Sequence, residues 1–356
     1  MGQFNRINMI DYTNTDIEKV SLHVVGNKSN GENLHLSKSL LDASDLRIRE
    51  LLFKFFLTPF SSSEYYSFSF TNGDFKLNPI FDFASKIFDN SKNFHKNSIY
   101  IAQHLYELSI HPQIKSGDLF IAYFSDISIE DELTDAIGIF KSETRQAFLK
   151  LESNSEDFII QYENGINIDK LDKGCLIYNT DRDTGFRVSI LDNTNKSNEA
   201  QYWRDLFLQL KPCRDEYHHT KDFMNITKDF VTKKLTEEFD VSRADQIDLL
   251  NRSIEYFKTH ETFEKKDFEK KVFQDNGIIK SFRSFDEAYR EDRDIKLENS
   301  FEISPQAVKK LSRVFKSVLK LDKNFHIYIH GNRDLIEQGV DKDGRKFYKI
   351  YFQNEA

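Results

Sequence analysis

The sequence predicts an α+β protein: an N-terminal domain with a mainly antiparallel sheet plus helices, and a mostly helical C-terminal domain closed by a β-hairpin. The chain has 356 residues, which suits two domains of ordinary size. It contains 33 Phe and 15 Tyr but only 13 Gly and 5 Pro, so it has the apolar area for sizeable cores and few residues that interrupt regular structure. The spacing of apolar residues also changes from strand-like to helical near residue 195.

The first predicted domain, residues 1–195, begins with a strand followed by helices. Apolar and polar residues alternate between residues 17 and 27, which is typical of an edge or half-buried strand. The first helix can be capped by Ser44 or Asp45 and is terminated by Pro59. Helical spacing of the apolar residues predicts three helices in all, at residues 46–58, 78–88 and 98–109.

The second half of this domain is predicted to be a run of antiparallel strands. Its segments are short, rich in β-branched and aromatic residues, and separated by turn residues. They are residues 119–129, 134–140, 146–152, 157–163, 174–180 and 186–192. The polar run at 193–200 that follows predicts a linker between the domains.

The second predicted domain, residues 196–356, is helical to about residue 285. A basic helix is expected at 305–320. Two segments near the end return to strand character and predict a closing hairpin over residues 324–352.

Charge is distributed unevenly along the chain. The net charge is −8, of which residues 1–195 carry −9 and residues 196–356 carry +1. Residues 301–356 alone carry +4, and the segment from Ser304 to Lys320 holds five basic residues and no acidic one. Positive potential is therefore expected in the last part of the chain.

The basic helix begins with Ser304 as N-cap and Pro305 at the first helical position. At 100° per residue, apolar side chains fall on one face, and a single-sign stripe forms on the other from Lys309, Arg313, Lys316 and Lys320, with Lys310 at its margin. Such a stripe suits a polyphosphate. The alternatives are a core-packed helix with a lysine-rich solvated side, or a membrane-surface helix if the apolar face were exposed.

Composition argues against several classes of protein. The two cysteines, Cys175 and Cys213, have no zinc-ligand or disulfide-framework spacing, which fits a reducing compartment. The longest apolar stretch, 51–57, is too short to span a bilayer, and the N-terminus lacks a signal core. A cytoplasmic protein without membrane contact is expected.

Four segments carry a family resemblance: SLHVVGNK at 21–28, the segment 98–124 around GDLF, DAIGIFKSE at 135–143, and residues 318–352. They resemble the bacterial nucleoid-associated protein family of the thirty-seven-kilodalton type, most closely its Phe- and Lys-rich branch. The resemblance spans nearly the whole chain. It implies a cytoplasmic protein found with the bacterial chromosome, with DNA binding, and it assigns no role to individual residues.

Signals for an enzyme are weak. No nucleotide-binding, zinc-protease or serine-hydrolase motif is present. Residues 179–185 resemble the opening of a calcium loop, but the glycine comes one position late, and a hairpin turn is the better interpretation. His326 and His330 share one face of a strand without an evident third ligand, and His218 and His219 adjoin acidic residues without forming one site. No catalytic residue, metal site or cofactor is predicted.

The function predicted from the sequence is a nucleoid-associated, sequence-nonspecific, non-enzymatic DNA-binding protein. Besides the basic helix, the hairpin residues Arg345, Lys346 and Lys349 are expected to contact phosphates. The aromatic residues Phe347, Tyr348 and Tyr351 could stack on single-stranded bases or pack against the helices. One alternative is an interaction module that docks on chromosome-associated enzymes through the acidic first domain. Another is an unrecognised metal-dependent nuclease. DNA and chromosome-associated proteins are the expected partners, and a homodimer is left open.

Overall fold

The fold consists of two compact units, Met1–Cys213 and Arg214–Ala356. The computed structural model describes residues 10–60, 64–129, 132–153, 157–194, 202–312, 315, 318–321, 324–328 and 335–354. Within this part of the chain the fold is α+β, as predicted, with the sheet in the first unit and most helices of the second unit packed around a core of their own.

The first unit is built on an antiparallel sheet. Among the described residues eight strands join it, in the order β1-β4-β5-β8-β9-β3-β10, with β2 paired to β4 beside this path. The strands are β1 (Ile10–Asp11), β2 (Asp16–Val25), β3 (Tyr65–Phe68), β4 (Gly117–Ile129), β5 (Glu132–Ser142), β8 (Lys173–Tyr178), β9 (Arg187–Asp192) and β10 (Leu210–Pro212).

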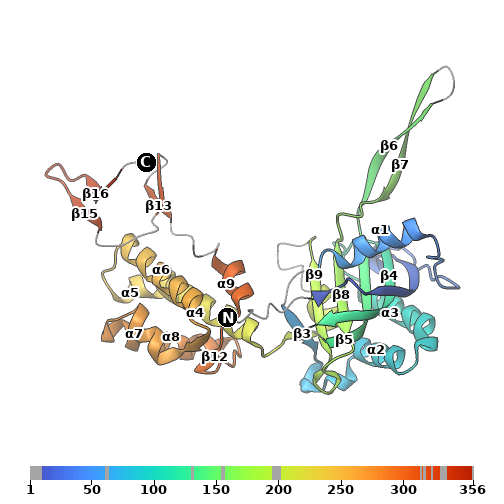
Figure 1. The fold of residues 1–356 in the computed structure, drawn as a ribbon, viewed down its shortest axis with the longest axis horizontal. Helices are drawn as coiled ribbons and strands as arrows, with labels where there is room; N and C mark the ends of the chain where they lie inside the picture. The colour runs from blue at the N-terminus through green and yellow to red at the C-terminus, as the bar shows by residue number, and fades with distance from the viewer. Residues whose placement is uncertain are drawn as a thin grey trace, which may run out of the picture. The chain divides into compact units, whose positions relative to one another are not determined.

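Helices cover both faces of this sheet (Figure 1). Helix α1 (Leu46–Leu57) packs on one face, where the ring of Phe56 stacks on Phe140 of β5 with centroids 4.4 Å apart. Helices α2 (Pro79–Asp89) and α3 (Phe94–Leu108) pack on the other face. Because side chains alternate along a strand, the odd-numbered residues 119–123 of β4 enter one core and the even-numbered residues 120–124 enter the other. This two-sided burial explains why β4 is almost continuously apolar.

Two of the predicted strands do not join the sheet. Strands β6 (Arg145–Ser153) and β7 (Phe158–Ile166) pair with each other as a separate two-stranded ribbon, which extends away from the sheet (Figure 1). All residues of this ribbon from 145 to 164 that the structure describes are exposed.

The first unit continues past the predicted boundary at residue 195. A π-helical segment, Tyr202–Leu208, packs into the core of the first unit, and β10 pairs with β3. The indole Nε1–H of Trp203 donates to the carbonyl oxygen of Gly174 at 3.3 Å, and the Trp203 side chain is fully buried. The division between the units therefore falls after Cys213. Of the predicted linker, residues 195–200 lie outside the described residues.

The second unit is a helical body around a phenylalanine-rich core. Its helices are α4 (Glu216–Asp229), a π-helical segment Phe230–Lys234, α5 (Leu235–Glu238), α6 (Arg243–Thr259), α7 (Lys265–Val272), α8 (Asn276–Asp292) and α9 (Pro305–Ser312). A short ladder joins β11 (Thr262–Glu264) to β12 (Ser300–Glu302). At the centre of the core, Phe223 is fully buried and contacts Phe263, Phe268 and Phe282.

The end of the chain corrects two expectations. Helix α9 ends at Ser312 rather than continuing to Lys320, and residues 318–321 form strand β13 (Val318–Leu321). Among the described residues, two hairpins stand in place of the one predicted over 324–352: β13 pairs with β14 (Phe325–Tyr328), and β15 (Ile336–Val340) pairs with β16 (Lys346–Ile350). Apolar residues at 315, 318 and 319 fit a helix face, but Leu321 and Ile327 pack against Ile247 of α6 from an extended pair of strands. This tertiary contact overrides the helical spacing.

Candidate nucleic-acid interface

Helix α9 places two predicted lysines on the surface of the second unit. Ser304 and Pro305 start the helix as expected, and the hydroxyl of Ser304 accepts the backbone N–H of Ala307 at 3.4 Å. Ala307 and Val308 are buried on the inner side, which contacts α4 and α6. The next two residues, Lys309 and Lys310, are therefore exposed.

The two lysines differ in their surroundings. Among the described residues, no carboxylate lies within 4.0 Å of the Lys309 ammonium group. The ammonium of Lys310 lies 5.8 Å from the ring centroid of Tyr217, in cation–π range. The predicted residues Arg313 and Lys316 lie outside the described residues. Lys320 lies on β13 opposite His326, rather than on the helix, and its side chain is outside the described part of the chain.

The second hairpin carries the other predicted basic residues, and two of them are ion-paired. Arg345 pairs with Asp343 at 3.2 Å and with Asp341 at 3.9 Å. Lys349 lies 3.6 Å from Glu337, and the pKa of its ammonium is raised by the hydroxyl of Tyr351 and by Glu337. Neutralisation by these carboxylates weakens the attraction of Arg345 and Lys349 for phosphate.

Lys346 is exposed and, within the described ranges, has no carboxylate within 4.0 Å. Lys346 and Lys349 are three residues apart on β16 and so face opposite sides of the hairpin. Tyr348, on the side of Lys346, packs against the small cluster around Ile247, while Phe347 lies over Gly339 and is 42% exposed. Of the predicted aromatic residues, Phe347 and Tyr351 are the ones that the hairpin leaves exposed.

This unit carries a second group of lysines that was not predicted from the sequence. Lys266 and Lys270 lie one turn apart on α7, and Lys280 lies on α8. All three are exposed, and no carboxylate of the described residues lies within 4.0 Å of their ammonium groups. Acidic residues flank them in the sequence, so no local excess of positive charge indicates them. Those acids pair elsewhere: Asp267 with Lys271 and Glu269 with Arg283.

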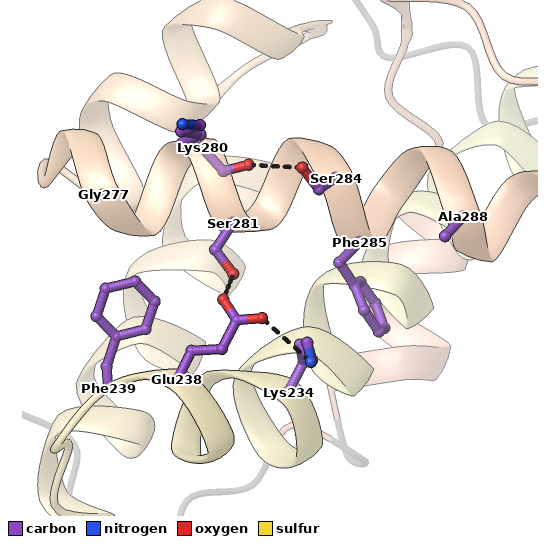
Figure 2. Close-up of a pocket in the computed structure, with 9 residues that line it drawn as sticks. All are labelled: Lys234, Glu238, Phe239, Gly277, Lys280, Ser281, Ser284, Phe285 and Ala288. Carbon is purple, nitrogen blue, oxygen red and sulfur yellow. Dashed lines mark hydrogen bonds and ion pairs between the residues drawn. The ribbon is translucent and has the colours of Figure 1, made fainter.

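A pocket of about 430 Å³ lies beside Lys280 (Figure 2). Glu238 sits between two partners, accepting a hydrogen bond from the hydroxyl of Ser281 at 2.5 Å and pairing with Lys234 at 3.1 Å. These contacts lower the pKa of Glu238, the Ser281 bond being the larger cause. The half-buried rings of Phe239 and Phe285 flank the group. Proteins that bind single-stranded nucleic acids commonly combine positively charged groups with aromatic rings. Lys234 and Lys280 are far apart in sequence, so no local pattern indicates the pocket.

The residues considered for metal binding are tied into local structure. The loop at 179–185 is the turn between β8 and β9, as predicted: Asp181 accepts from Arg187 at 2.9 Å, and Gly185 has φ +108°. The Nδ1 of His218 lies 2.9 Å from Asp215, and His219 packs on Phe301. His330 lies outside the described residues. In the part of the chain that the structure describes, no three His, Cys, Asp or Glu side chains are grouped to hold a metal ion.

The most unusual ionisable cluster is buried in the first unit. Lys141 and Lys173 are 0% and 1% exposed, and their ammonium groups lie beside the ring of Tyr202. Burial lowers the pKa of Lys141. The ammonium of Lys141 donates to Glu143, to the carbonyl of Lys115 and to the hydroxyl of Tyr202, so its three protons are all used. This arrangement ties β5 to the π-helical segment.

No helix among the described residues is both long and apolar enough to cross a bilayer. A family model described as "NA37: Nucleoid-associated protein YejK" matches residues 21–345, and no curated protein matches the chain. The matched region includes most of the sheet, the helical body and the hairpin strands as far as β15, in agreement with the resemblance of the four sequence segments. The protein therefore belongs to the NA37 family of nucleoid-associated proteins.

Proposed function

We propose that this protein binds DNA without base-sequence preference through exposed lysines of its second unit, and that it does so without catalysis. Family membership supports the nucleoid-associated role. The observation that carries the mechanism is Lys309: it is exposed on the outer side of α9 with no acidic neighbour among the described residues. An unpaired ammonium of this kind can neutralise a phosphate and release a counterion.

The charge distribution supports binding through the second unit. Residues 1–213 carry a net charge of −8 and residues 214–356 carry none, because the +4 of residues 301–356 offsets −4 in the helices before them. The first unit should repel a duplex, so contact must come from local clusters of lysine in the second. We assign it to Lys309, Lys310 and Lys346, joined by Arg313, Lys316 and Lys320 of the same stretch. Arg345 and Lys349 contribute less because each has a carboxylate partner.

A salt titration with two duplexes of unrelated sequence tests this proposal. The wild type should bind both equally, with log K falling linearly with log salt. Changing Lys309, Lys310 and Lys346 together to Gln should reduce the slope by about 2.7 units if all three touch phosphate, at about 0.9 per contact. The matched control changes Lys76, Lys92 and Lys96 of the acidic unit to Gln, and its slope should equal that of the wild type.

A third variant locates the contact. Changing Lys266, Lys270 and Lys280 to Gln removes the same charge from the same unit, at the surface formed by α7 and α8. If this variant shows the reduced salt slope and the variant at Lys309, Lys310 and Lys346 keeps the wild-type slope, DNA lies against α7 and α8 and the assignment to those three lysines is wrong. If the wild type shows no salt-dependent binding at all, DNA binding itself is refuted.

The acidic first unit favours a second candidate function, docking on basic surfaces of chromosome-associated proteins. Its net charge of −8 would attract a DNA-binding surface of another protein. This candidate predicts that the isolated protein leaves DNA free but competes with DNA for such a partner, with competition weakening as salt rises.

A further inference from the structure

The ribbon formed by β6 and β7 has one apolar face and one charged face. The register pairs Leu149 with Tyr162 and Leu151 with Ile160, and Ser153 with Phe158 at its outer end. Residues paired in this way lie on the same side of a two-stranded ribbon. The large residues of this side are mostly exposed: Leu149 and Tyr162 to 71% each, Leu151 to 68%, Ile160 to 67% and Phe158 to 78%.

The opposite face is adapted to water. Lys150 pairs there with Glu152 at 2.9 Å and with Glu163 at 3.7 Å, and Gln161 lies across from it. The apolar residues of this face are less exposed: Phe148 is 49% exposed and its ring lies over Gly165, and Ile159 is 44% exposed. The ribbon thus has the polarity pattern of one layer of a two-layer β-structure.

A ribbon of this kind needs a second layer. Two strands alone are marginally stable in water, and a contiguous apolar patch of this size marks an interaction site. The five side chains of the apolar face present on the order of 500 Å² of surface, so two such faces packed together would bury about 1,000 Å² before their flanks are counted, close to the lower limit for a stable dimer.

We infer that the apolar face of β6 and β7 packs against the same face of a second copy of this chain. The one charged residue on this side of the described ribbon, Arg145, lies at the inner end and is paired with Asp118. The five large apolar side chains lie farther out, so a partner for them must be equally apolar, and an identical face meets this requirement under twofold symmetry. The charged faces of both ribbons would then point outward into water, as in a β-sandwich.

The hairpins of the second unit are less suited to cover it. Ile336 and Tyr348 of the β15–β16 hairpin, and Leu321 and Ile327 of the β13–β14 hairpin, already pack around Ile247. Their apolar sides are therefore partly used within their own unit, whereas the ribbon offers all of its apolar face.

A pair of matched variants tests this inference in the full-length protein. Leu151→Thr with Ile160→Thr changes one register pair of the apolar face, and Lys150→Thr with Gln161→Thr changes the neighbouring pair of the charged face. Threonine retains strand propensity in both. Sedimentation equilibrium should show a wild-type dimer near 10 µM, about tenfold or more weakening in the apolar-face variant, and a dimer in the charged-face variant.

Two outcomes would overturn the inference: a wild type that remains monomeric up to about 100 µM, or a dimer that the apolar-face variant does not weaken. A second measurement guards against loss of folding. Tyr162→Cys should be joined to its counterpart in the second copy by a bifunctional thiol reagent, while Lys150→Cys should not, because only the apolar faces meet. Efficient cross-linking through Lys150→Cys with none through Tyr162→Cys would also refute the packing.

Discussion

The ammonium of Lys141 lies 2.9 Å from the carboxylate of Glu143 in the interior of the first unit, with side-chain exposures of 0% and 3%. Burial of both charges makes this pair different from the surface pairs of the chain. Tyr202 of the π-helical segment helps to fix the geometry of the pair, because its hydroxyl accepts a hydrogen bond from Lys141 and donates one to Glu143.

Removal of this buried ammonium should be costly. In Lys141→Met, Glu143 would remain buried without its counter-charge, and we expect the free energy of unfolding to fall by about 3 to 5 kcal/mol. The matched control is Lys86→Met, which breaks the exposed Lys86–Asp82 pair at 2.5 Å and should cost no more than about 0.5 kcal/mol. Urea denaturation of both variants measures the difference. Equal losses of free energy of unfolding would show that burial does not determine the cost of breaking an ion pair in this protein.

His23 should make the stability of the protein depend on pH. Its Nδ1 accepts the backbone N–H of Ser37 at 3.1 Å, its Nε2 lies 3.1 Å from the hydroxyl of Ser98, and it is 1% exposed. Burial, with the nearby His95, lowers the pKa of His23 from 6.5 to about 4. Between these two pH values His23 binds a proton in the unfolded chain but not in the folded chain. The free energy of unfolding is therefore at its full value above pH 6.5 and decreases as the pH falls toward 4.

The change His23→Gln should remove that part of the pH dependence. Between pH 6.5 and 4, the wild type should lose about 2 to 3 kcal/mol more of its free energy of unfolding than the variant. The exposed His35 provides a control, since His35→Gln should keep the wild-type profile. Denaturation curves at several pH values suffice, and parallel profiles for wild type and His23→Gln would contradict the assignment.

Gly185 should not tolerate a side chain. Its φ is +108°, and a Cβ atom there would lie 2.7 Å from the carbonyl oxygen of Phe68 on the neighbouring strand. Gly185→Ala should therefore destabilise the protein by about 2 to 3 kcal/mol, from strain and displaced backbone together. Gly344→Ala is the matched case, because φ is +79° but nothing lies within 4 Å, and it should cost about 1 kcal/mol. Thermal unfolding ranks the two, and a reversed order would refute the clash.

The two units should unfold separately. Trp203 is the one tryptophan of the sequence and lies in the first core, whereas Phe223 lies in the second. Phe223→Ala should destabilise the second unit by about 3 to 5 kcal/mol through the cavity it leaves. The urea midpoint from Trp203 fluorescence should stay unchanged, while the far-UV circular dichroism transition moves to lower urea. A fluorescence midpoint that moved in parallel would show that the units unfold together.

Local sequence information was sufficient for the starts of two helices. Ser304 and Pro305 predicted where α9 begins, and Asp45, one of the two predicted caps, precedes α1. These starts were predictable because capping depends on a few neighbouring residues. The end of α9 was not, because residues 318–321 satisfy helical and strand patterns equally, and their contacts with distant α6 decide between them.

The sequence by itself determined the α+β class and the positions of most strands, which follow from the periodicity of apolar residues, and four of its segments indicated the family. Only the tertiary structure decided that Tyr202–Leu208 belongs to the first unit and that β6 and β7 leave the sheet. It also decided which cations are paired with acidic neighbours. The physical reason is common to all three: strand partners, core partners and ion pairs are chosen between residues far apart in the chain, by packing and Coulomb energies that a local pattern does not contain.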